Sequence, residues 1–98
     1  MKKEKKEIFF KIIKELKRYN PKKISVFGSY VRNEETSKSD IDIIVEFSGK
    51  KSLLELVGIE QELSEKLKMK VDLLTLNSIS PYILPYIKKE EKVIYEKK

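Results

Sequence analysis

Two aspartates at alternating positions, Asp40 and Asp42, are the residues of this 98-residue chain whose types and spacing most clearly suggest chemistry. The segment that follows Asp40 is apolar and β-branched, as is typical of a strand. Residues two apart on a strand point to the same side, so we expect the two carboxylates side by side at the start of a strand. Adjacent carboxylates repel each other unless a cation lies between them, and a divalent, oxygen-binding metal is the usual solution.

A third aspartate, Asp72, lies in another predicted strand, residues 71–76. Of the 16 Asp plus Glu residues only three are Asp, and all three fall at or within predicted strands. Asp is depleted in strands, whereas a short carboxylate on a rigid strand suits metal coordination. If the two strands are neighbours in register, we expect Asp40, Asp42 and Asp72 to converge on one site. Taken singly, each has a plainer interpretation: Asp40 as a turn residue, Asp42 as a solvated strand residue, and Asp72 as the partner of a lysine such as Lys70.

A Gly-Ser pair, Gly28-Ser29, follows the predicted strand 23–27 and precedes a predicted helical turn around residues 30–33. A glycine at such a turn lets backbone N–H groups approach a phosphate closely. The Ser29 hydroxyl adds a donor or a metal-facing group, and Arg32 is one turn further on. We do not expect Ser29 to act as a covalent nucleophile, because no base in the sequence would activate it. Phosphates beside carboxylate-bound metals are the ingredients of phosphoryl or nucleotidyl transfer.

The composition excludes several other classes of site. The chain has no Cys and no His, which rules out disulfides, thiolate or histidine zinc sites, and catalysis by Ser-His-Asp or Cys-His groups. No apolar run approaches the roughly 18–20 residues that cross a membrane, and residues 1–7 lack the apolar core of a signal peptide. We therefore expect a cytoplasmic protein with no membrane partner.

The charge is unevenly distributed. The net charge is +6, yet residues 24–47, which contain the paired aspartates, hold two basic and five acidic residues. The first predicted helix is basic, and we expect its cations to form a solvated face: Lys5, Lys11, Lys14, Lys17 and Arg18. A second interpretation is that these cations bind an acidic partner or RNA. Without a recognisable RNA- or DNA-binding motif, this face does not favour direct nucleic-acid binding.

The hydrophobic periodicity predicts an α+β fold, a small mixed sheet flanked by helices, in one domain spanning residues 1–98. The expected order is helix, strand, short helix, strand, helix, strand, helix, strand. The first helix should cover residues 4–19, and the second should begin with a capping box at Ser52 and Glu55 and run to about Leu67. The strands should cover residues 23–27, 41–47, 71–76 and 93–95. The predicted core positions of the two helices are Phe9, Ile12, Ile13, Leu16, Leu53, Leu56, Ile59, Leu63 and Leu67.

Pro85 interrupts the last predicted helix, which follows residues 77–81 and runs to about Lys89. A proline inside a helix removes a backbone hydrogen bond unless the helix begins close to it. Two arrangements remain open: residues 79–83 form a separate turn, or the helix is kinked.

The segments Gly28-Ser29-Tyr30-Val31-Arg32-Asn33 and Ser39-Asp40-Ile41-Asp42 resemble the Gly-Ser…Asp-x-Asp signature of the DNA polymerase β-like nucleotidyltransferases. Within them the chain is most similar to the minimal nucleotidyltransferase family, the MntA-like antitoxins that pair with HEPN-domain toxins. The resemblance covers nearly the whole chain, including Lys70-Val71-Asp72-Leu73 and the tail Ile94-Tyr95-Glu96. The family commonly has Gly where this chain has Asn33, a residue that tolerates left-handed backbone better than most.

The resemblance implies a role for each residue. Gly28 and Ser29 would hold the triphosphate with Arg32 nearby, Asp40 and Asp42 would bind two Mg²⁺ (or Mn²⁺) ions, and Asp72 would complete a metal site and help activate the attacking hydroxyl. The implied reaction is Mg²⁺-dependent transfer of AMP from ATP to a hydroxyl, often a Tyr of the cognate HEPN toxin, which is thereby neutralised. The short chain leaves little room for a separate acceptor domain, which favours a partner protein as acceptor. Two alternatives remain: an antitoxin that acts by binding alone, and a stand-alone small-molecule adenylyltransferase.

Overall fold

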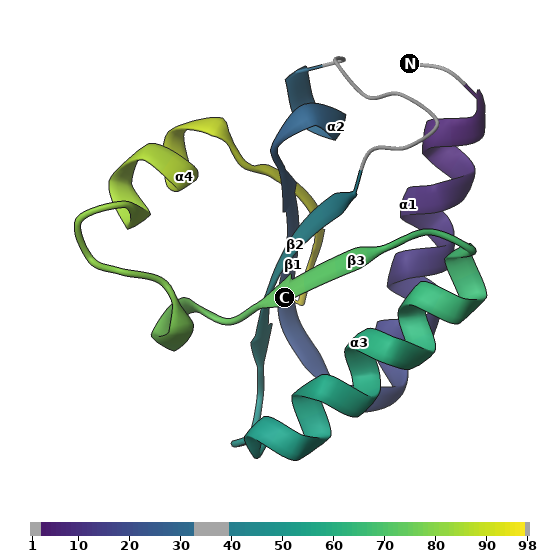
Figure 1. The fold of residues 1–98 in the computed structure, drawn as a ribbon, viewed down its shortest axis with the longest axis horizontal. Helices are drawn as coiled ribbons and strands as arrows, with labels where there is room; N and C mark the ends of the chain where they lie inside the picture. The colour runs from purple at the N-terminus through teal and green to yellow at the C-terminus, as the bar shows by residue number, and fades with distance from the viewer. Residues whose placement is uncertain (1–2, 33–39, 98) are drawn as a thin grey trace.

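The elements of the protein follow the predicted order, in a computed structural model that describes residues 3–32 and 40–97 (Figure 1). The helices are α1 (Lys3–Leu16), α2 (Ser29–Arg32), α3 (Leu53–Leu67) and α4 (Leu84–Glu90), and two short 3-10 segments are η1 (Lys17–Tyr19) and η2 (Leu76–Ser78). The strands are β1 (Pro21–Phe27), β2 (Ile41–Phe47), β3 (Val71–Leu74) and β4 (Lys92–Glu96). The predicted α+β class is therefore confirmed.

The four strands form one mixed sheet in the order β3-β2-β1-β4. β1 is antiparallel to both β2 and β4, whereas β2 and β3 are parallel and are joined through α3. Helices α1 and α3 lie together on one side of the sheet, and α4 lies on the other (Figure 1). β2 and β3 are thus adjacent, which is the condition on which the predicted convergence of the aspartates depended.

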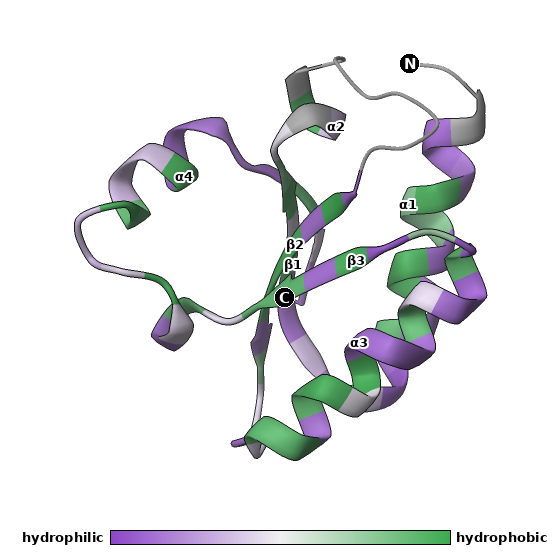
Figure 2. Ribbon diagram, in the orientation of Figure 1, coloured by the Kyte–Doolittle hydropathy of each residue, from purple (hydrophilic) through white to green (hydrophobic). Residues whose placement is uncertain are grey.

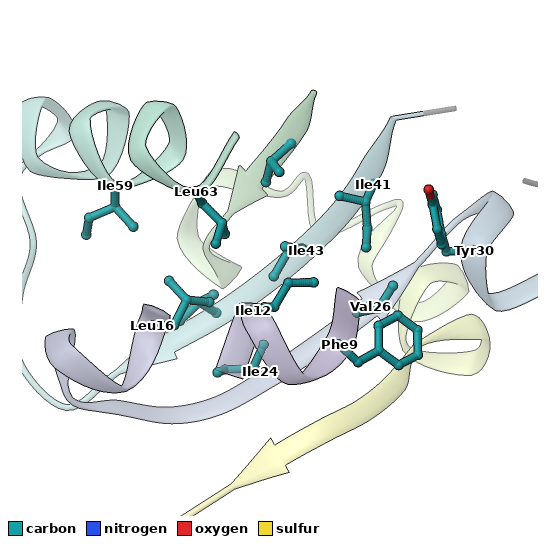
Figure 3. Close-up of a cluster of buried hydrophobic side chains, with 12 residues drawn as sticks. Phe9, Ile12, Leu16, Ile24, Val26, Tyr30, Ile41, Ile43, Ile59 and Leu63 are labelled. Carbon is teal, nitrogen blue, oxygen red and sulfur yellow. The ribbon is translucent and has the colours of Figure 1, made fainter. Parts of the chain in front are cut away.

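The core lies between the sheet and the helices α1 and α3, where the apolar sides of these elements face one another (Figures 2 and 3). Alternate residues of β2, Ile41, Ile43 and Val45, are fully buried on this face, as the two-residue period of a strand requires. The side chains packed against the sheet include Phe9, Ile12, Leu16, Ile59 and Leu63. Each large apolar side chain buried in this way contributes about 1.5–3 kcal/mol, so β2 is firmly oriented and its opposite face is fixed.

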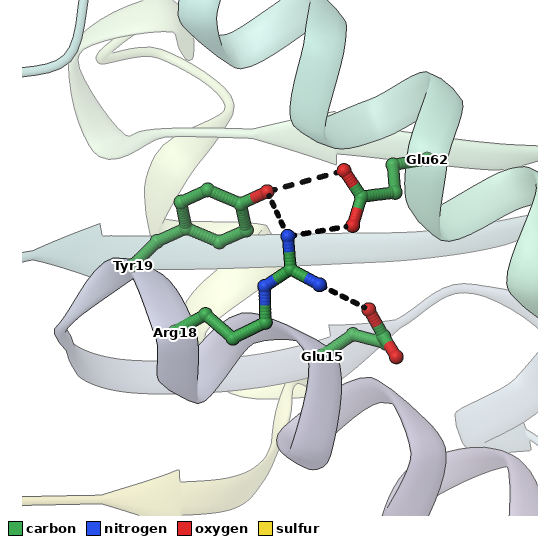
Figure 4. A network of polar contacts seen from close by, with 4 residues as sticks. All are labelled: Glu15, Arg18, Tyr19 and Glu62. Atoms are coloured by element: carbon green, nitrogen blue, oxygen red, sulfur yellow. Dashed lines mark hydrogen bonds and ion pairs between the residues drawn. The ribbon is translucent and has the colours of Figure 1, made fainter.

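A smaller set of polar contacts joins the end of α1 to α3 (Figure 4). The Arg18 guanidinium lies 2.9 Å from Glu62 Oε1 and 3.5 Å from Glu15 Oε2, and the Tyr19 hydroxyl donates to Glu62 Oε2 at 3.3 Å. The Glu62 carboxylate raises the pKa of Arg18 above its ordinary value. Because the Arg18 side chain is 55% exposed, this network orients the helices more than it stabilises them.

Several boundaries differ from the sequence-based expectation. α1 ends at Leu16 and continues as η1, and β1 begins at Pro21 rather than at residue 23. β3 ends at Leu74, because Ser78 Oγ accepts from the Thr75 N–H at 3.2 Å and turns the chain into η2. Pro85 lies in the first turn of α4, where the missing N–H removes no helical hydrogen bond, and residues 81–83 form the separate turn that was one of the two alternatives.

The predicted start of α3 is confirmed, but its first core position is wrong. Ser52 Oγ accepts from the Glu55 N–H at 3.1 Å and Glu55 Oε1 accepts from the Ser52 N–H at 3.1 Å, which is the expected capping box. Leu53 is 77% exposed, because α3 buries residues only further along, at Ile59 and Leu63. None of the helices in the described ranges is long and apolar enough to cross a membrane.

Gly58, in the middle of α3, offers a test of helix stability. A Cβ built on Gly58 meets no atom within 4 Å, so Gly58→Ala adds no clash. We expect this variant to raise the free energy of unfolding by about 0.5–1 kcal/mol, because alanine loses less backbone entropy than glycine on entering a helix. Urea denaturation followed by circular dichroism measures the difference, and a lower midpoint than that of the wild type would contradict the expectation.

Candidate active site

Asp42 and Asp72 are direct partners in the parallel pairing of β2 with β3. Their neighbours Ile41 and Val71 are buried among the helices, so the two aspartates project from the opposite face of the sheet. Both residues are half-buried, and adjacent strands lie about 4.8 Å apart. The strand order thus brings together two of the three predicted aspartates.

Asp40 lies directly before β2 and has a different partner. Its Oδ2 atom is 3.8 Å from Lys70 Nζ, and the Ile41 N–H donates to the Lys70 carbonyl at 3.1 Å. Lys70, the lysine that the sequence offers as a partner of Asp72, therefore forms an ion pair with Asp40. Within residues 3–32 and 40–97, no group of three or more acidic side chains is arranged to hold a metal ion.

The donor chemistry of this edge of the sheet nevertheless fits a hard divalent cation. Asp42 and Asp72 offer carboxylate oxygens, the ligands that Mg²⁺ and Mn²⁺ prefer, and the chain has no Cys or His that would favour a softer metal. Like charges directly opposite each other on neighbouring strands are unfavourable, and a cation between them removes that cost. Asp42 and Asp72 are thus the residues that would hold a metal here, with Asp40 two residues before Asp42.

Gly28 brings the predicted phosphate-binding turn against the Asp42 carboxylate. It follows β1 directly after Phe27, which pairs with Asp42, and it has a left-handed φ of +82°. A Cβ at this position would lie 2.5 Å from Asp42 Oδ2. Only glycine satisfies both the backbone conformation and the space, which is a structural reason for the residue that the motif singled out.

Helix α2 begins immediately after Gly28 and carries Ser29 at its start and Arg32 at its end. The turn is closed by the Val31 N–H, which donates to the Gly28 carbonyl at 3.0 Å. Asn33, the position at which the sequence departs from the motif, lies outside the described residues.

Two charged residues for which the sequence predicted no role in the site also hold this turn. Glu90 Oε1 accepts from the Gly28 N–H at 3.1 Å, across 62 residues of sequence. Lys5 Nζ donates to the Tyr30 carbonyl at 2.8 Å and lies 6.0 Å from the centroid of the Tyr30 ring. Lys5 is only 5% exposed, so its predicted place on the solvated face of α1 is wrong. No local pattern marks either residue, because both contacts depend on how distant elements pack.

Comparison with known proteins agrees with this geometry. The family model described as polymerase beta, nucleotidyltransferase, matches residues 10–98. A protein of Methanocaldococcus jannaschii with the provisional name of a protein adenylyltransferase is 52% identical over 93 residues, which cover 92% of each chain. The protein adenylyltransferase MntA of Thermococcus cleftensis is 40% identical over 83 residues, 84% of this chain and 82% of its own.

Solved structures show the same similarity. A toxin–antitoxin crystal structure with AMP-PNP matches with a TM-score of 0.83 and 28% identity, covering 92% of this chain and 74% of that one. A chain of the complex between a tri-AMPylated Shewanella oneidensis HEPN toxin and its MNT antitoxin matches with a TM-score of 0.78 and 26% identity, covering 95% and 73%. The resemblance carried by the Gly-Ser and Asp-x-Asp segments is therefore confirmed, and the chain belongs to the polymerase beta nucleotidyltransferase family, with MntA-type protein adenylyltransferases among its relatives.

Proposed function

We propose that this protein uses Mg²⁺ to transfer AMP from ATP to a tyrosine hydroxyl of a HEPN-type partner protein, and that it thereby acts as an antitoxin. The pairing of Asp42 with Asp72, with the Gly28 turn against Asp42, is the observation that carries the proposal. The names of its relatives, which include a protein adenylyltransferase, and the AMP-PNP in a similar solved structure support the same reaction.

The proposed reaction forms a bond between the acceptor oxygen and the α-phosphorus of ATP and breaks the bond to pyrophosphate, which leaves. Mg²⁺, when bound, neutralises negative charge on the phosphates. Asp40 and Asp42 are its proposed ligands. Asp72, on the neighbouring strand, completes the metal site and draws the proton from the attacking hydroxyl. The turn formed by Gly28 and Ser29, with Arg32 beyond it, holds the departing phosphates.

The reaction is tested by incubating the protein with Mg²⁺, a candidate HEPN-domain partner from the same organism, and ATP labelled at the α-phosphate. We expect label on the partner, no label when the γ-phosphate is labelled instead, and none on a partner whose acceptor Tyr is replaced by Phe. The absence of any transfer from α-labelled ATP would overturn the enzymatic proposal.

A second experiment separates catalysis from binding. An Asp40→Asn/Asp42→Asn double variant should still bind its partner but no longer neutralise it. If neutralisation survives unchanged, contact alone explains the antitoxin. If label instead enters a small molecule without any partner present, the protein acceptor is wrong.

A further inference from the structure

We propose that Glu90 is a positioning residue for the Gly28 turn, and that the Gly28 N–H, which donates to Glu90, is not itself a ligand of the nucleotide phosphates. This inference rests on the proposed function, because it assumes that the turn binds phosphate. It starts from one contact, the hydrogen bond from the Gly28 N–H to Glu90 Oε1 at 3.1 Å.

Gly28 lies between two carboxylates that constrain it from different sides. Its N–H donates to Glu90, and the side on which a Cβ would project lies against Asp42 Oδ2. A hydrogen bond to an ionised acceptor is about twice as strong as one between neutral groups, and Glu90 is half-buried, where water competes less. The hydrogen bond to Glu90 therefore helps to hold Gly28 in its left-handed conformation, in addition to the local backbone.

The position of Glu90 is fixed by the junction between α4 and β4. Glu90 is the last residue of α4, and the pairing of β4 with β1 ends where Lys92 meets Val26. The adjacent Glu91 Oε1 lies 3.3 Å from Lys23 Nζ, which attaches the junction to β1 a second time. Glu90 thus extends the hydrogen bonding of β1 beyond the end of β4, to the residue where the turn begins.

The direction of the effect on nucleotide binding distinguishes two roles for this carboxylate. A carboxylate oxygen and a phosphate oxygen seek the same kind of N–H donor. If the Gly28 N–H were the phosphate ligand, Glu90 would compete with ATP, and its removal would tighten binding. If Glu90 positions the turn, its removal releases Gly28 and weakens binding.

The test compares Glu90→Ala, Glu90→Gln and the neighbouring Glu91→Gln by calorimetry of Mg²⁺-ATP binding. We expect Glu90→Ala to weaken ATP binding about tenfold, or about 1.4 kcal/mol. Glu90→Gln should stay within about threefold of the wild type, because its amide oxygen still accepts from Gly28. Glu91→Gln loses the charge of the Lys23 pair at the same junction and should keep wild-type affinity with a slightly lower melting temperature.

Amide hydrogen exchange at Gly28, measured by NMR without nucleotide, provides a second readout that does not depend on ATP. Exchange should become about tenfold faster in Glu90→Ala and remain unchanged in Glu91→Gln. Unaltered exchange, or ATP binding in Glu90→Ala as tight as or tighter than in the wild type, would overturn the positioning role. If the wild-type protein binds no ATP, the proposed function is wrong, and so is the role of the Gly28 turn in binding phosphate. Faster Gly28 exchange in Glu90→Ala would still support the hydrogen bond between Gly28 and Glu90.

Discussion

An Asp42→Asn variant is expected to transfer AMP at least about a hundredfold more slowly than the wild type while keeping its fold, since removing one preorganised electrostatic group typically costs that much. Asparagine has nearly the same shape, so the pairing of β2 with β3 should persist. Its neutral amide is a poor ligand for a hard cation beside Asp72. Initial rates of label transfer at saturating ATP measure the loss, and circular dichroism verifies the fold.

Glu46→Gln is the matched control for this variant. Glu46 lies four residues further along β2, on the same face of the strand, and is also half-buried. The Glu46→Gln substitution therefore removes the same charge from the same strand, but away from the Gly28 turn. We expect its transfer rate to stay within about twofold of the wild type, in line with the small effect of one screened charge. Equal losses of transfer rate in both variants would mean that the overall electrostatic field of the protein, and not a metal ligand, causes the effect. Full activity in Asp42→Asn would show that Asp42 is not part of the active site.

Metal binding gives an independent measure of the same residue. A ligand that binds only the folded state raises the melting temperature. Mg²⁺ should therefore raise the melting temperature of the wild type and of Glu46→Gln, and it should have little effect on Asp42→Asn.

A Gly28→Ala variant is expected to lose nearly all transfer activity and about 1–2 kcal/mol of stability, which is the typical cost of left-handed backbone for a residue with a Cβ. The φ of +82° accounts for the stability loss. The loss of activity goes beyond what this loss of stability would cause. The new methyl group would lie 2.5 Å from Asp42 Oδ2, so Asp42, the proposed metal ligand, must move. Denaturation curves and label-transfer rates on the same preparation separate the two effects.

The Gly58→Ala variant makes the same substitution where neither constraint applies. Its Cβ would meet nothing within 4 Å, so its stability should rise while its activity stays at the wild-type level. A loss of stability in Gly28→Ala and a gain in Gly58→Ala would show that an added methyl group is not harmful in itself. The loss at Gly28 would then be due to its backbone conformation and its contact with Asp42. A Gly28→Ala protein that is stable and active would contradict the site.

Much of the fold was predictable because it follows from local periodicity. The two-residue alternation in β2 correctly placed Ile41 and Ile43 in the core and Asp42 on the opposite face. Leu53 was misassigned because an apolar residue at helical spacing is buried only if another element covers it, and the first turn of α3 has no such cover. The order of the strands was not predictable, because it depends on how α3 packs against α1 and the sheet.

The candidate site divides in the same way. Gly28 and Asp42 were found from motif spacing, and the structure shows why they belong together. Lys5 and Glu90 were not found, because each contacts the turn across a long stretch of sequence and resembles the many other charged residues of this chain. The roles of Lys5 and Glu90 depend on tertiary packing and cannot be recognised in any one segment of the sequence.

The parallel register of β2 and β3 makes the chemistry of this protein sensitive to insertions and deletions as well as to substitutions. One residue inserted in β3 before Asp72 would turn its carboxylate toward the helices and carry Leu73 to the opposite face. The connection through α3 can change in length, provided that the Lys70 carbonyl still meets the Ile41 N–H. Two related chains could therefore share all three aspartates and differ in activity, if one residue had been gained or lost between Lys70 and Asp72.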